Sequence, residues 1–546
     1  MNCKTSLLVL IIIMLINPKA IASEYYIHPI LGKDSNTGDS KKYPFKTLKH
    51  LQQIQFLPGD KIMLANGQNY PESLELINQI GTLKNPILIT SIEWNTNDRA
   101  TSATIDFKNQ ANGILIEDCS FIEISNLRLT GNGYIHKDEN LKMRCGIVLT
   151  TKKSKLMEHI FIKNITIQEV YYENPGFIRG KEEVKTANGS QKYGWGIRLI
   201  DNDPETVMEN IKIENCIINS VSHTGIKLTG NSKNIRKVQL LNNTILNTGG
   251  PGIQMSEVTE IHVSKNKVSH SGCTDDSRKW GRGSGLWTWG SSNVLIEKNE
   301  FIYANGPGDS AGAHIDYNCD NIVIQYNLSA YNAGGFCEIL GNNYNCIYRY
   351  NISINDGHRI KGEHGAFQEG KVFWLSGYQG SKEPKGPVNS YFYNNTIYSD
   401  VSIEAKFAID DTSKGLVIAN NIFCIKGGSK VVLGDQNRKD NQNKLKVENV
   451  FFKNNLFLNK TTWPKDLKIE DSAPIIGNPE FFNEGGLKIT DYIPKNLIVT
   501  QNKGIEIPAL PESSIKLLFD LNIEKDIMNN VIKGTPGIGA ITFTKQ

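Results

Sequence analysis

The chain has 546 residues, with 60 Lys and Arg against 56 Asp and Glu and a formal net charge of +4. So small a basic excess argues against non-specific binding to nucleic acid, and charge must be considered locally. A chain of this length ordinarily folds as about two to four domains, but a repeat described below predicts one.

The first residues have the features of an export signal. Lys4 precedes an apolar run from Leu7 to Ile16, and a small-residue stretch ends in Ala20, Ile21 and Ala22. A charged region, a short apolar region and an Ala-x-Ala site define a signal peptide, which we expect to span residues 1–22. The apolar run is too short to cross a membrane. We therefore predict a soluble protein that is secreted or periplasmic and has no membrane partner.

The next segment, about residues 23–60, predicts an N-terminal cap. It holds a first strand, a short helix around "FKTLKHLQQI" and the phrase "PGDKIML" at the start of the first coil. "DSNTGD" is faintly like a calcium loop, but its spacing and the missing terminal Glu favour an Asx-rich turn.

One phrase, apolar-x-apolar-x-x-Asn-x-apolar, recurs through the rest of the chain. Its Asn falls at eight positions: Asn243, Asn266, Asn299, Asn327, Asn351, Asn395, Asn421 and Asn455. The intervals are 23, 33, 28, 24, 44, 26 and 34 residues. A core period in the low twenties with variable insertions is typical of a solenoid, and asparagines stacked at a turn can hydrogen-bond along it.

The strand pattern indicates which solenoid. Each unit has short period-2 runs of Ile and Val separated by Gly, Asn and Ser, without helical periodicity between them. The pattern predicts an all-β fold, a right-handed parallel β-helix in which each coil adds one strand to several parallel sheets. We expect a single domain over residues 23–546, with long loop insertions and a closing segment at about 460–546.

A second strand precedes the Asn phrase in each coil, as in "GIRL" at 196 and "GIKL" at 225. With Ile and Leu facing inward, the residue between them faces outward. Carried along the coils, this phase predicts one outward row of Arg198, Lys227, Gln254, Trp287, His314 and Glu338. A parallel row holds Thr229, Ser256, Trp289 and Asp316.

These rows carry chemistry that solvation of a sheet face does not require. Exposed Trp287 and Trp289 suit stacking on sugar rings, although packing beneath a loop is the alternative. Long insertions beside the same coils supply further basic side chains, including arginines, which can bind the carboxylate or sulfate groups of a sugar. We predict these substrate-binding residues: Trp287, Trp289, Gln254, Arg282, Arg359, His358 and His364.

The N-terminal stretch "YYIHPILGKDSNTGDSKKYPFKTLKHLQQIQFLPGDKIML" and the tail "GTPGIGAITF" resemble secreted β-helix carbohydrate-active enzymes of the pectate-lyase-like and polysaccharide-lyase-like superfamily. The resemblance implies an anionic polysaccharide or oligosaccharide as substrate, such as the algal uronate polymers ulvan or alginate. The calcium-binding Asn, Glu, Glu set with partnered Lys and Arg, found in the chondroitinase- and alginate-lyase-like members, is missing, which leaves the exact family open.

The first hypothesis for the reaction is β-elimination on a uronic acid, by a lyase or an oligosaccharide dehydratase. Elimination needs a cation on the sugar carboxylate, a base for the C5 proton and an acid for the leaving oxygen. Arg198 or Lys227 is the candidate cation, His314 or Lys227 the base, and His223 or Tyr317 the acid. Asp316 would orient an imidazole or bind a hydroxyl, and Glu338 completes the predicted catalytic set.

Two alternatives remain open. A glycoside hydrolase would use a pair of carboxylates among Asp309, Asp316 and Glu338, which lie on adjacent coils. A non-catalytic glycan-binding β-helix would explain the tryptophans but not the acidic cluster.

No cofactor or metal site is predicted, with calcium as an unsupported option, and a monomer is the default for a capped solenoid. The cysteines after the signal show no metal-like spacing, so buried thiols and one or two disulfides are both open.

Overall fold

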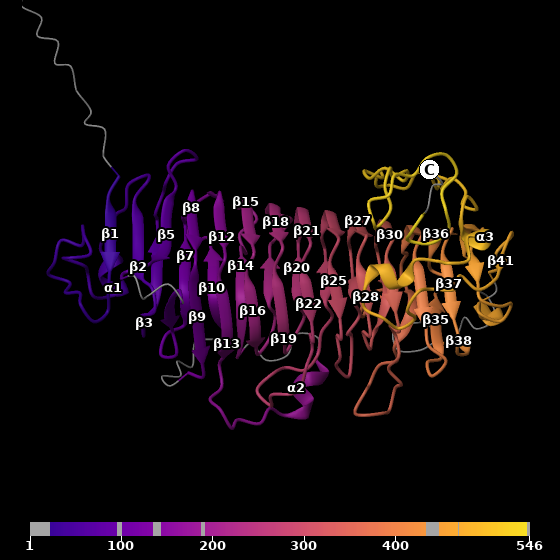
Figure 1. Cartoon of the computed structure of the whole chain (residues 1–546), viewed down its shortest axis with the longest axis horizontal. Coiled ribbons are helices and arrows are strands. Elements are labelled where there is room, and N and C mark those ends of the chain that lie inside the picture. The colour runs from indigo at the N-terminus through magenta and orange to yellow at the C-terminus, as the bar shows by residue number, and fades with distance from the viewer. Residues whose placement is uncertain are drawn as a thin grey trace, which may run out of the picture.

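The computed structural model describes residues 22–95, 101–134, 143–186, 192–432, 447–467 and 469–542. The predicted signal peptide lies outside these residues, apart from Ala22. Within them the chain winds into an elongated parallel β-helix, with successive coils side by side along the long axis (Figure 1). None of its described helices is long and apolar enough to cross a membrane.

Each coil contributes one strand to each of three parallel sheets, here numbered in chain order within a coil. Sheet 1 has 12 described strands: β4 (Leu74–Ile77), β7 (Asn112–Glu117), β10 (Met143–Thr150), β14 (Tyr193–Ile200), β17 (Ile226–Thr229), β20 (Ile253–Ser256), β23 (Leu286–Trp289), β26 (Ala313–Ile315), β29 (Gly335–Ile339), β32 (Lys371–Leu375), β35 (Ala405–Ile409) and β38 (Ser429–Val431).

Sheet 2 has 15 described strands: β1 (Glu24–Ile27), β2 (Lys61–Ala65), β5 (Ile87–Ile92), β8 (Ile122–Ser125), β11 (Leu156–Glu158), β12 (Ile160–Lys163), β15 (Val207–Glu214), β18 (Ile235–Leu241), β21 (Val258–Ser264), β24 (Ser292–Glu297), β27 (Asp320–Gln325), β30 (Tyr344–Arg349), β33 (Val388–Tyr393), β36 (Lys414–Ala419) and β39 (Glu448–Lys453). Sheet 3 has 14: β3 (Asn69–Tyr70), β6 (Ala103–Asp106), β9 (Leu127–Asn132), β13 (Thr166–Tyr171), β16 (Ile217–Val221), β19 (Thr244–Thr248), β22 (Lys267–Ser269), β25 (Glu300–Ile302), β28 (Leu328–Ala330), β31 (Ile352–Ile354), β34 (Thr396–Ser399), β37 (Ile422–Ile425), β40 (Leu456–Phe457) and β41 (Ile475–Ile476).

The predicted asparagine ladder is confirmed and lies at the turn from sheet 2 to sheet 3. The side-chain nitrogen of Asn266 donates to Oδ1 of Asn299 at 2.9 Å, and Asn299 donates to Asn327 at 2.9 Å. The same bond joins all eight repeated asparagines in turn. The residue before each ladder asparagine has a left-handed φ, as Lys298 does at 56°. The ladder therefore satisfies buried polar groups at a turn whose backbone conformation is itself unfavourable.

Short helices and loops close the two ends of the core. The capping helix expected near residue 50 is α1 (Leu48–Leu51), whose two leucines are buried in the first coils. At the other end, Trp463 packs against the rings of Phe407, Phe423 and Phe452, just before a short 3₁₀ helix, η2 (Lys465–Leu467). Both ends of the apolar core are thus covered.

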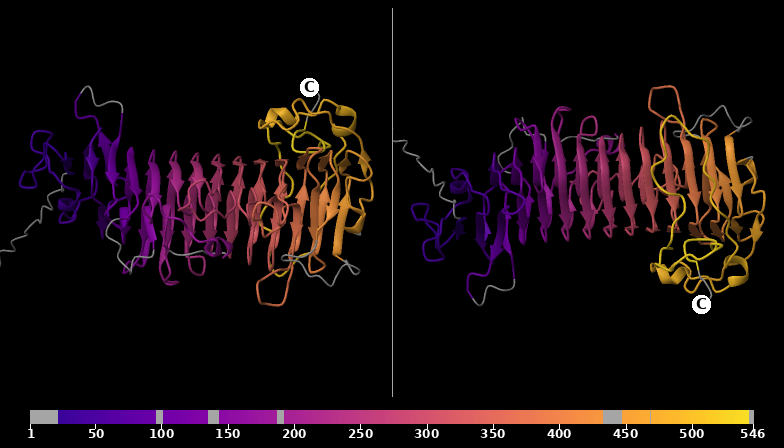
Figure 2. Two further views of the ribbon diagram at one scale, coloured as in Figure 1. Left: turned by 90° about the horizontal axis from the view of Figure 1, so that it is seen from below. Right: turned by 90° about the horizontal axis from the view of Figure 1, so that it is seen from above.

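The chain beyond this plug does more than close the end. It passes through η3 (Ile489–Tyr492) and α3 (Leu497–Thr500) and returns along the outer face of sheet 2, where it is yellow in Figure 1 and in both views of Figure 2. Tyr393 donates to the carbonyl of Leu521 at 2.7 Å, and Tyr326 donates to that of Lys525 at 2.7 Å. This C-terminal segment buries the outward side chains of β27, β30 and β33.

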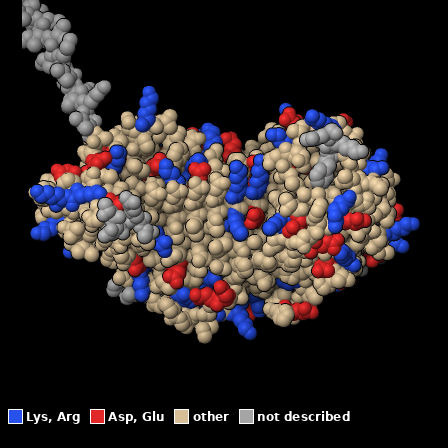
Figure 3. Space-filling model, viewed as in Figure 1, with Lys and Arg blue, Asp and Glu red and all other residues tan. Residues whose placement is uncertain are grey.

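Within the described residues all eight cysteines are free thiols, and seven of them are buried. The sequence left buried thiols and one or two disulfides both open, and the described cysteines are buried thiols with one partly exposed exception. Lys and Arg are interspersed with Asp and Glu on the face shown in Figure 3.

Candidate active site

The predicted outward rows are present on sheet 1, in the expected register. Lys227 pairs with Gln254, Gln254 with Trp287, and Trp287 with His314. Arg198 stands beside Lys227 at one end, and pairing of Ile315 with Ile339 places Glu338 next to His314 at the other. In the second row Ser256 pairs with Trp289, and Asp316 directly follows β26.

A cavity of about 530 Å³ opens over the C-terminal part of these rows. Its floor comes from β23, β26 and β29, and its walls come from α2 (Lys181–Lys185), the loops before β23 and β26 and the loop after β32. The lining residues are Lys185, Arg282, Trp287, Trp289, Asp309, His314, Asp316, Tyr317, Glu338, Leu340, Tyr378, Gln379, Gly380 and Lys382. Seven predicted site residues therefore meet in one place: Arg282, Trp287, Trp289, His314, Asp316, Tyr317 and Glu338.

Three carboxyl groups line this cavity in three different electrostatic environments. Burial, and then the charge of Asp309, raises the pKa of Glu338 to about 8. Burial is also the main cause that raises the pKa of Asp316 to about 6, where the neighbouring charges of Glu338 and Asp309 add to it and that of His314 opposes it. The cavity thus holds carboxyl groups that are protonated at mildly acidic to neutral pH.

Asp309 differs because it has a cationic partner. Nε of Arg282 lies 2.9 Å from Oδ2 of Asp309, and its terminal nitrogen lies 3.3 Å from Oδ1. Burial alone would raise the pKa of Asp309, but the positive charges of Arg282, His314 and Arg359 and the hydrogen bond from Arg282 together outweigh it, and the pKa is lowered. Asp309 is therefore an ionised carboxylate beside two carboxyl groups that are partly protonated. Acid–base catalysis uses such a difference, because one group must give a proton while the other is charged.

His314 lies deep in the floor, between Trp287 and Glu338. Its Nδ1 is 2.9 Å from the hydroxyl of Ser284 and 3.9 Å from a carboxyl oxygen of Glu338. Burial lowers the pKa of His314, so the ring is neutral at neutral pH. A neutral imidazole here orients its neighbours but supplies no cation for a sugar carboxylate.

The aromatic residues form one side of the cavity. Trp287 is partly exposed and donates its indole N–H to Oδ2 of Asp316 at 2.8 Å. Trp289 and Tyr317 have ring centroids 5.6 Å apart, and Lys382 donates to the hydroxyl of Tyr317 at 2.9 Å. These partly open rings next to carboxyl groups suit stacking on a sugar ring.

Four predicted site residues lie outside this cavity, on the N-terminal side. Lys227 is three ladder steps from His314, about 14 Å at the usual strand spacing, and Arg198 is one step further. Gln254 is buried between them and Trp287. His223 is buried, with its ring stacked between Trp280, at 4.5 Å between centroids, and Trp195, at 5.1 Å. The structure does not bring these four side chains to the reacting centre that elimination requires.

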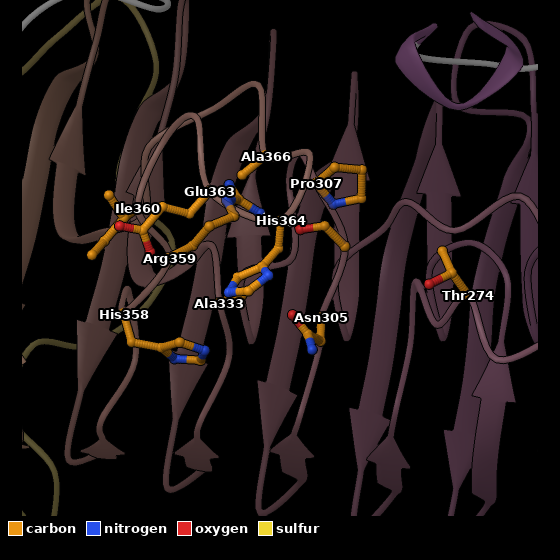
Figure 4. Close-up of a pocket in the computed structure, with 11 residues that line it drawn as sticks. Thr274, Asn305, Pro307, Ala333, His358, Arg359, Ile360, Glu363, His364 and Ala366 are labelled. Carbon is orange, nitrogen blue, oxygen red and sulfur yellow. Dashed lines mark hydrogen bonds between the residues drawn. The ribbon is translucent and has the colours of Figure 1, made fainter. Parts of the chain in front are cut away.

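The other three lie at a second, separate cavity of about 410 Å³. His358, His364 and Asn305 point toward the same space there (Figure 4). The guanidinium of Arg359 is occupied by the chain itself, since it donates to the carbonyls of Gly306 at 2.8 Å and Asp309 at 3.0 Å. Arg359 therefore fastens the loop that carries Asp309.

Several lining residues were absent from the predicted site. The sequence predicts Asp309 only as a carboxylate of the hydrolase alternative, and Lys185, Tyr378, Gln379 and Lys382 come from insertions whose course the repeat does not determine. The loop sequence "SGYQGSKEPKG" follows a sheet 1 strand directly, which was the available signal. Within the described residues no group of three or more His, Cys, Asp or Glu is placed to hold a metal ion.

Comparison with known proteins supports the fold. Residues 196–379 match the family model "Right handed beta helix region", so the predicted right-handed parallel β-helix is confirmed. A curated lacto-N-biosidase from Bifidobacterium longum subsp. longum is 22% identical over 619 residues, covering 95% of this chain and 36% of that protein. The chain thus spans about a third of the length of the curated relative it matches.

Among solved structures, the native GH136 lacto-N-biosidase from Eubacterium ramulus has 17% identity and a TM-score of 0.53, covering 78% of this chain and 68% of that one. Its selenomethionine derivative gives a TM-score of 0.51, with 78% of this chain and 67% of that chain covered. At this identity the likeness concerns the β-helix fold.

Proposed function

We propose that the chain is an exported glycoside hydrolase. Asp309 and Asp316 are its two catalytic carboxyl groups, and the glycosidic bond is cleaved in the space between them. The observation that carries the proposal is the pairing, in one cavity, of an ionised carboxylate with a carboxyl whose pKa is raised to about 6. Glycoside hydrolysis needs one group of each kind, an acid for the leaving oxygen and a carboxylate that acts as nucleophile or base. The curated relative that matches 95% of the chain is named as a glycosidase, which supports the same reaction class.

In this mechanism the partly exposed Asp316 protonates the leaving oxygen, and Asp309 acts as the carboxylate. Trp287 holds Asp316 through its indole N–H, while Arg282 holds Asp309 through two nitrogens. Glu338 and His314 are more deeply buried and act as positioning residues, because their side chains are only 5% exposed.

β-Elimination, the first hypothesis, has weaker support. It requires a free cation beside the sugar carboxylate, and in this cavity Arg282 is already neutralised by Asp309. Lys382 is directed to Tyr317. The candidate cations Arg198 and Lys227 lie about 14 Å or more away along the sheet.

The test is turnover of a neutral aryl lacto-N-bioside and of uronate-containing oligosaccharides by the wild type and three variants. We expect Asp309→Asn and Asp316→Asn each to lower kcat by about 10²–10⁴-fold while remaining folded. Asp411→Asn, at an acidic pair outside the cavity, should retain activity within about twofold. With an activated leaving group such as fluoride, Asp316→Asn should recover most of its activity and Asp309→Asn should not.

Products with a new conjugated double bond would overturn the proposal, as would full activity of a folded Asp309→Asn or Asp316→Asn variant. New reducing ends without unsaturation support it. Loss of activity in Asp411→Asn alone would also count against the assigned pair.

A further inference from the structure

The outward row continues beyond the cavity toward the N-terminus, where two cations stand side by side. Arg198 on β14 pairs with Lys227 on β17, and Lys227 pairs with Gln254 on β20. Like charges on adjacent strands repel each other, so the pair raises the free energy of the folded state unless something neutralises it.

Within the described chain neither cation forms an ion pair or hydrogen bond with a carboxylate. Arg198 contacts the sulfur of Met143 at 2.8 Å and the ring of Trp195 at 5.0 Å. Burial raises the pKa of the adjacent Cys145 to about 12, so this thiol stays neutral. Burial, followed by repulsion from Arg198, lowers the pKa of Lys227 to about 7.

Several buried polar atoms in and around this pair also lack hydrogen-bond partners. Arg198 is only 7% exposed and Gln254 only 4%, yet Nε of Arg198, a donor, and Oε1 of Gln254, an acceptor, have no hydrogen-bond partner. An oxyanion satisfies the first and a sugar hydroxyl satisfies the second. Oγ1 of Thr229, in the parallel row, likewise has no hydrogen-bond partner. Buried polar groups are normally satisfied, and an orphaned one costs free energy. Lys227 keeps part of its surface exposed, so a ligand can reach the group.

We propose that Arg198 and Lys227 form a binding site for an oxyanion, a carboxylate or a sulfate, on a sugar of the same glycan whose bond is cleaved in the cavity, and that Gln254 beside them accepts from a hydroxyl of that sugar. Trp287 connects the two places, since it pairs with Gln254 on one side and with His314 on the other. This inference rests on the proposed glycosidase function. A neutral sugar lies at the carboxylates, and a charged one lies about three coils away along sheet 1.

Calorimetric titration of the folded full-length protein tests this site without turnover. The probes are sodium D-glucuronate, D-glucose 6-sulfate and the neutral methyl β-D-glucoside, at one ionic strength. We expect at least one anionic probe to bind about tenfold or more tightly than the neutral one, and the tighter of the two identifies carboxylate or sulfate as the recognised group. Lys227→Met and Arg198→Met should each remove this preference, a loss of about tenfold or more.

Two further measurements distinguish binding from folding. Without ligand, Lys227→Met should have a higher melting temperature than the wild type, because it removes a charge that lacks a partner. Lys237→Met, at an exposed lysine on sheet 2, should keep the preference for the anionic probe.

An unchanged preference in a folded Lys227→Met variant would overturn the anion site, as would equal binding of all three probes by the wild type. The readout is binding alone, so an anionic preference that persists in a protein without glycosidase activity would refute only the proposed function. Activity on neutral substrates without anionic preference would refute only the subsite.

Discussion

The carboxyl of Glu338 shows how strongly a single side chain depends on its surroundings. Its position beside His314 follows from the register, but its raised pKa follows from burial and from Asp309, which lies 29 residues earlier in the chain. Period-2 patterns predict that Glu338 faces outward. They do not predict that loops cover it, because those loops have no repeat.

This raised pKa has a consequence for stability. The proton on Glu338 favours the folded state, so its stabilisation is complete below about pH 4.5, the ordinary value, and is lost as the pH rises through about 8. Glu338→Gln never ionises. We therefore expect its melting temperature to equal that of the wild type at pH 4 and to exceed it by a few degrees at pH 9.

Glu297→Gln is the matched control, with the opposite sign. The hydrogen bond with His262 lowers the pKa of Glu297 against the effect of burial, so its contribution is present at neutral pH and is lost on acidification. This variant should be less stable than the wild type at pH 7. The difference in melting temperature between Glu338→Gln and the wild type should be larger at pH 9 than at pH 4. An equal difference at the two pH values would contradict the raised pKa.

At the scale of the element, the asparagine ladder is the feature that the sequence predicts best. Each ladder residue after Asn243 accepts from the backbone and side chain of the ladder asparagine one coil earlier, as Asn299 does from the N–H and the amide of Asn266. The repeated phrase places every asparagine at the same turn, so its role can be read locally. The insertions between the phrases vary in length without disturbing it.

We expect Asn299→Ala to destabilise the protein by about 2–4 kcal/mol, because it leaves the buried backbone N–H of Asn266 without an acceptor and removes the bonds that the side chain of Asn299 donates to Val263 and Asn327. Thermal unfolding with calorimetric enthalpy measures the effect. Gln239→Ala, at an exposed position on β18, should change stability by less than about 0.5 kcal/mol. Equal effects of the two substitutions would show that the ladder contributes no specific stability.

For the whole molecule, stability depends on two apolar clusters. One fills the interior of the coils from Ile27 to Leu467. The other lies outside the coils, between sheets 2 and 3 and the C-terminal segment, and includes Val323, Ile352 and Leu521. Outward valines and isoleucines at regular strand positions are explained only when this segment covers them.

A pair of leucines on the C-terminal segment tests this cover. Leu521 is 8% exposed and Leu518 is 59% exposed. Leu521→Ala should cost about 2–4 kcal/mol through lost burial and a residual cavity, whereas Leu518→Ala should cost less than about 0.5 kcal/mol. Thermal unfolding measures both, and a Leu521→Ala variant as stable as Leu518→Ala would mean that the segment adds little to the fold.

The sequence by itself determined the coil, the ladder and the two outward rows, because each depends on spacing within about one repeat. The period-2 pattern is enough to place Arg198, Lys227, Gln254, Trp287 and His314 in one row, and the strand pairing has them there. The tertiary structure alone decided which of them share a cavity. Asp309, Glu338 and Tyr378 meet there from different coils and loops, and their charge states follow from burial and from Arg282. Neither the set of residues that share the cavity nor their charge states is a property of a short stretch of sequence. The same holds for the C-terminal segment, whose return over sheet 2 depends on an apolar surface formed only when the coils have stacked.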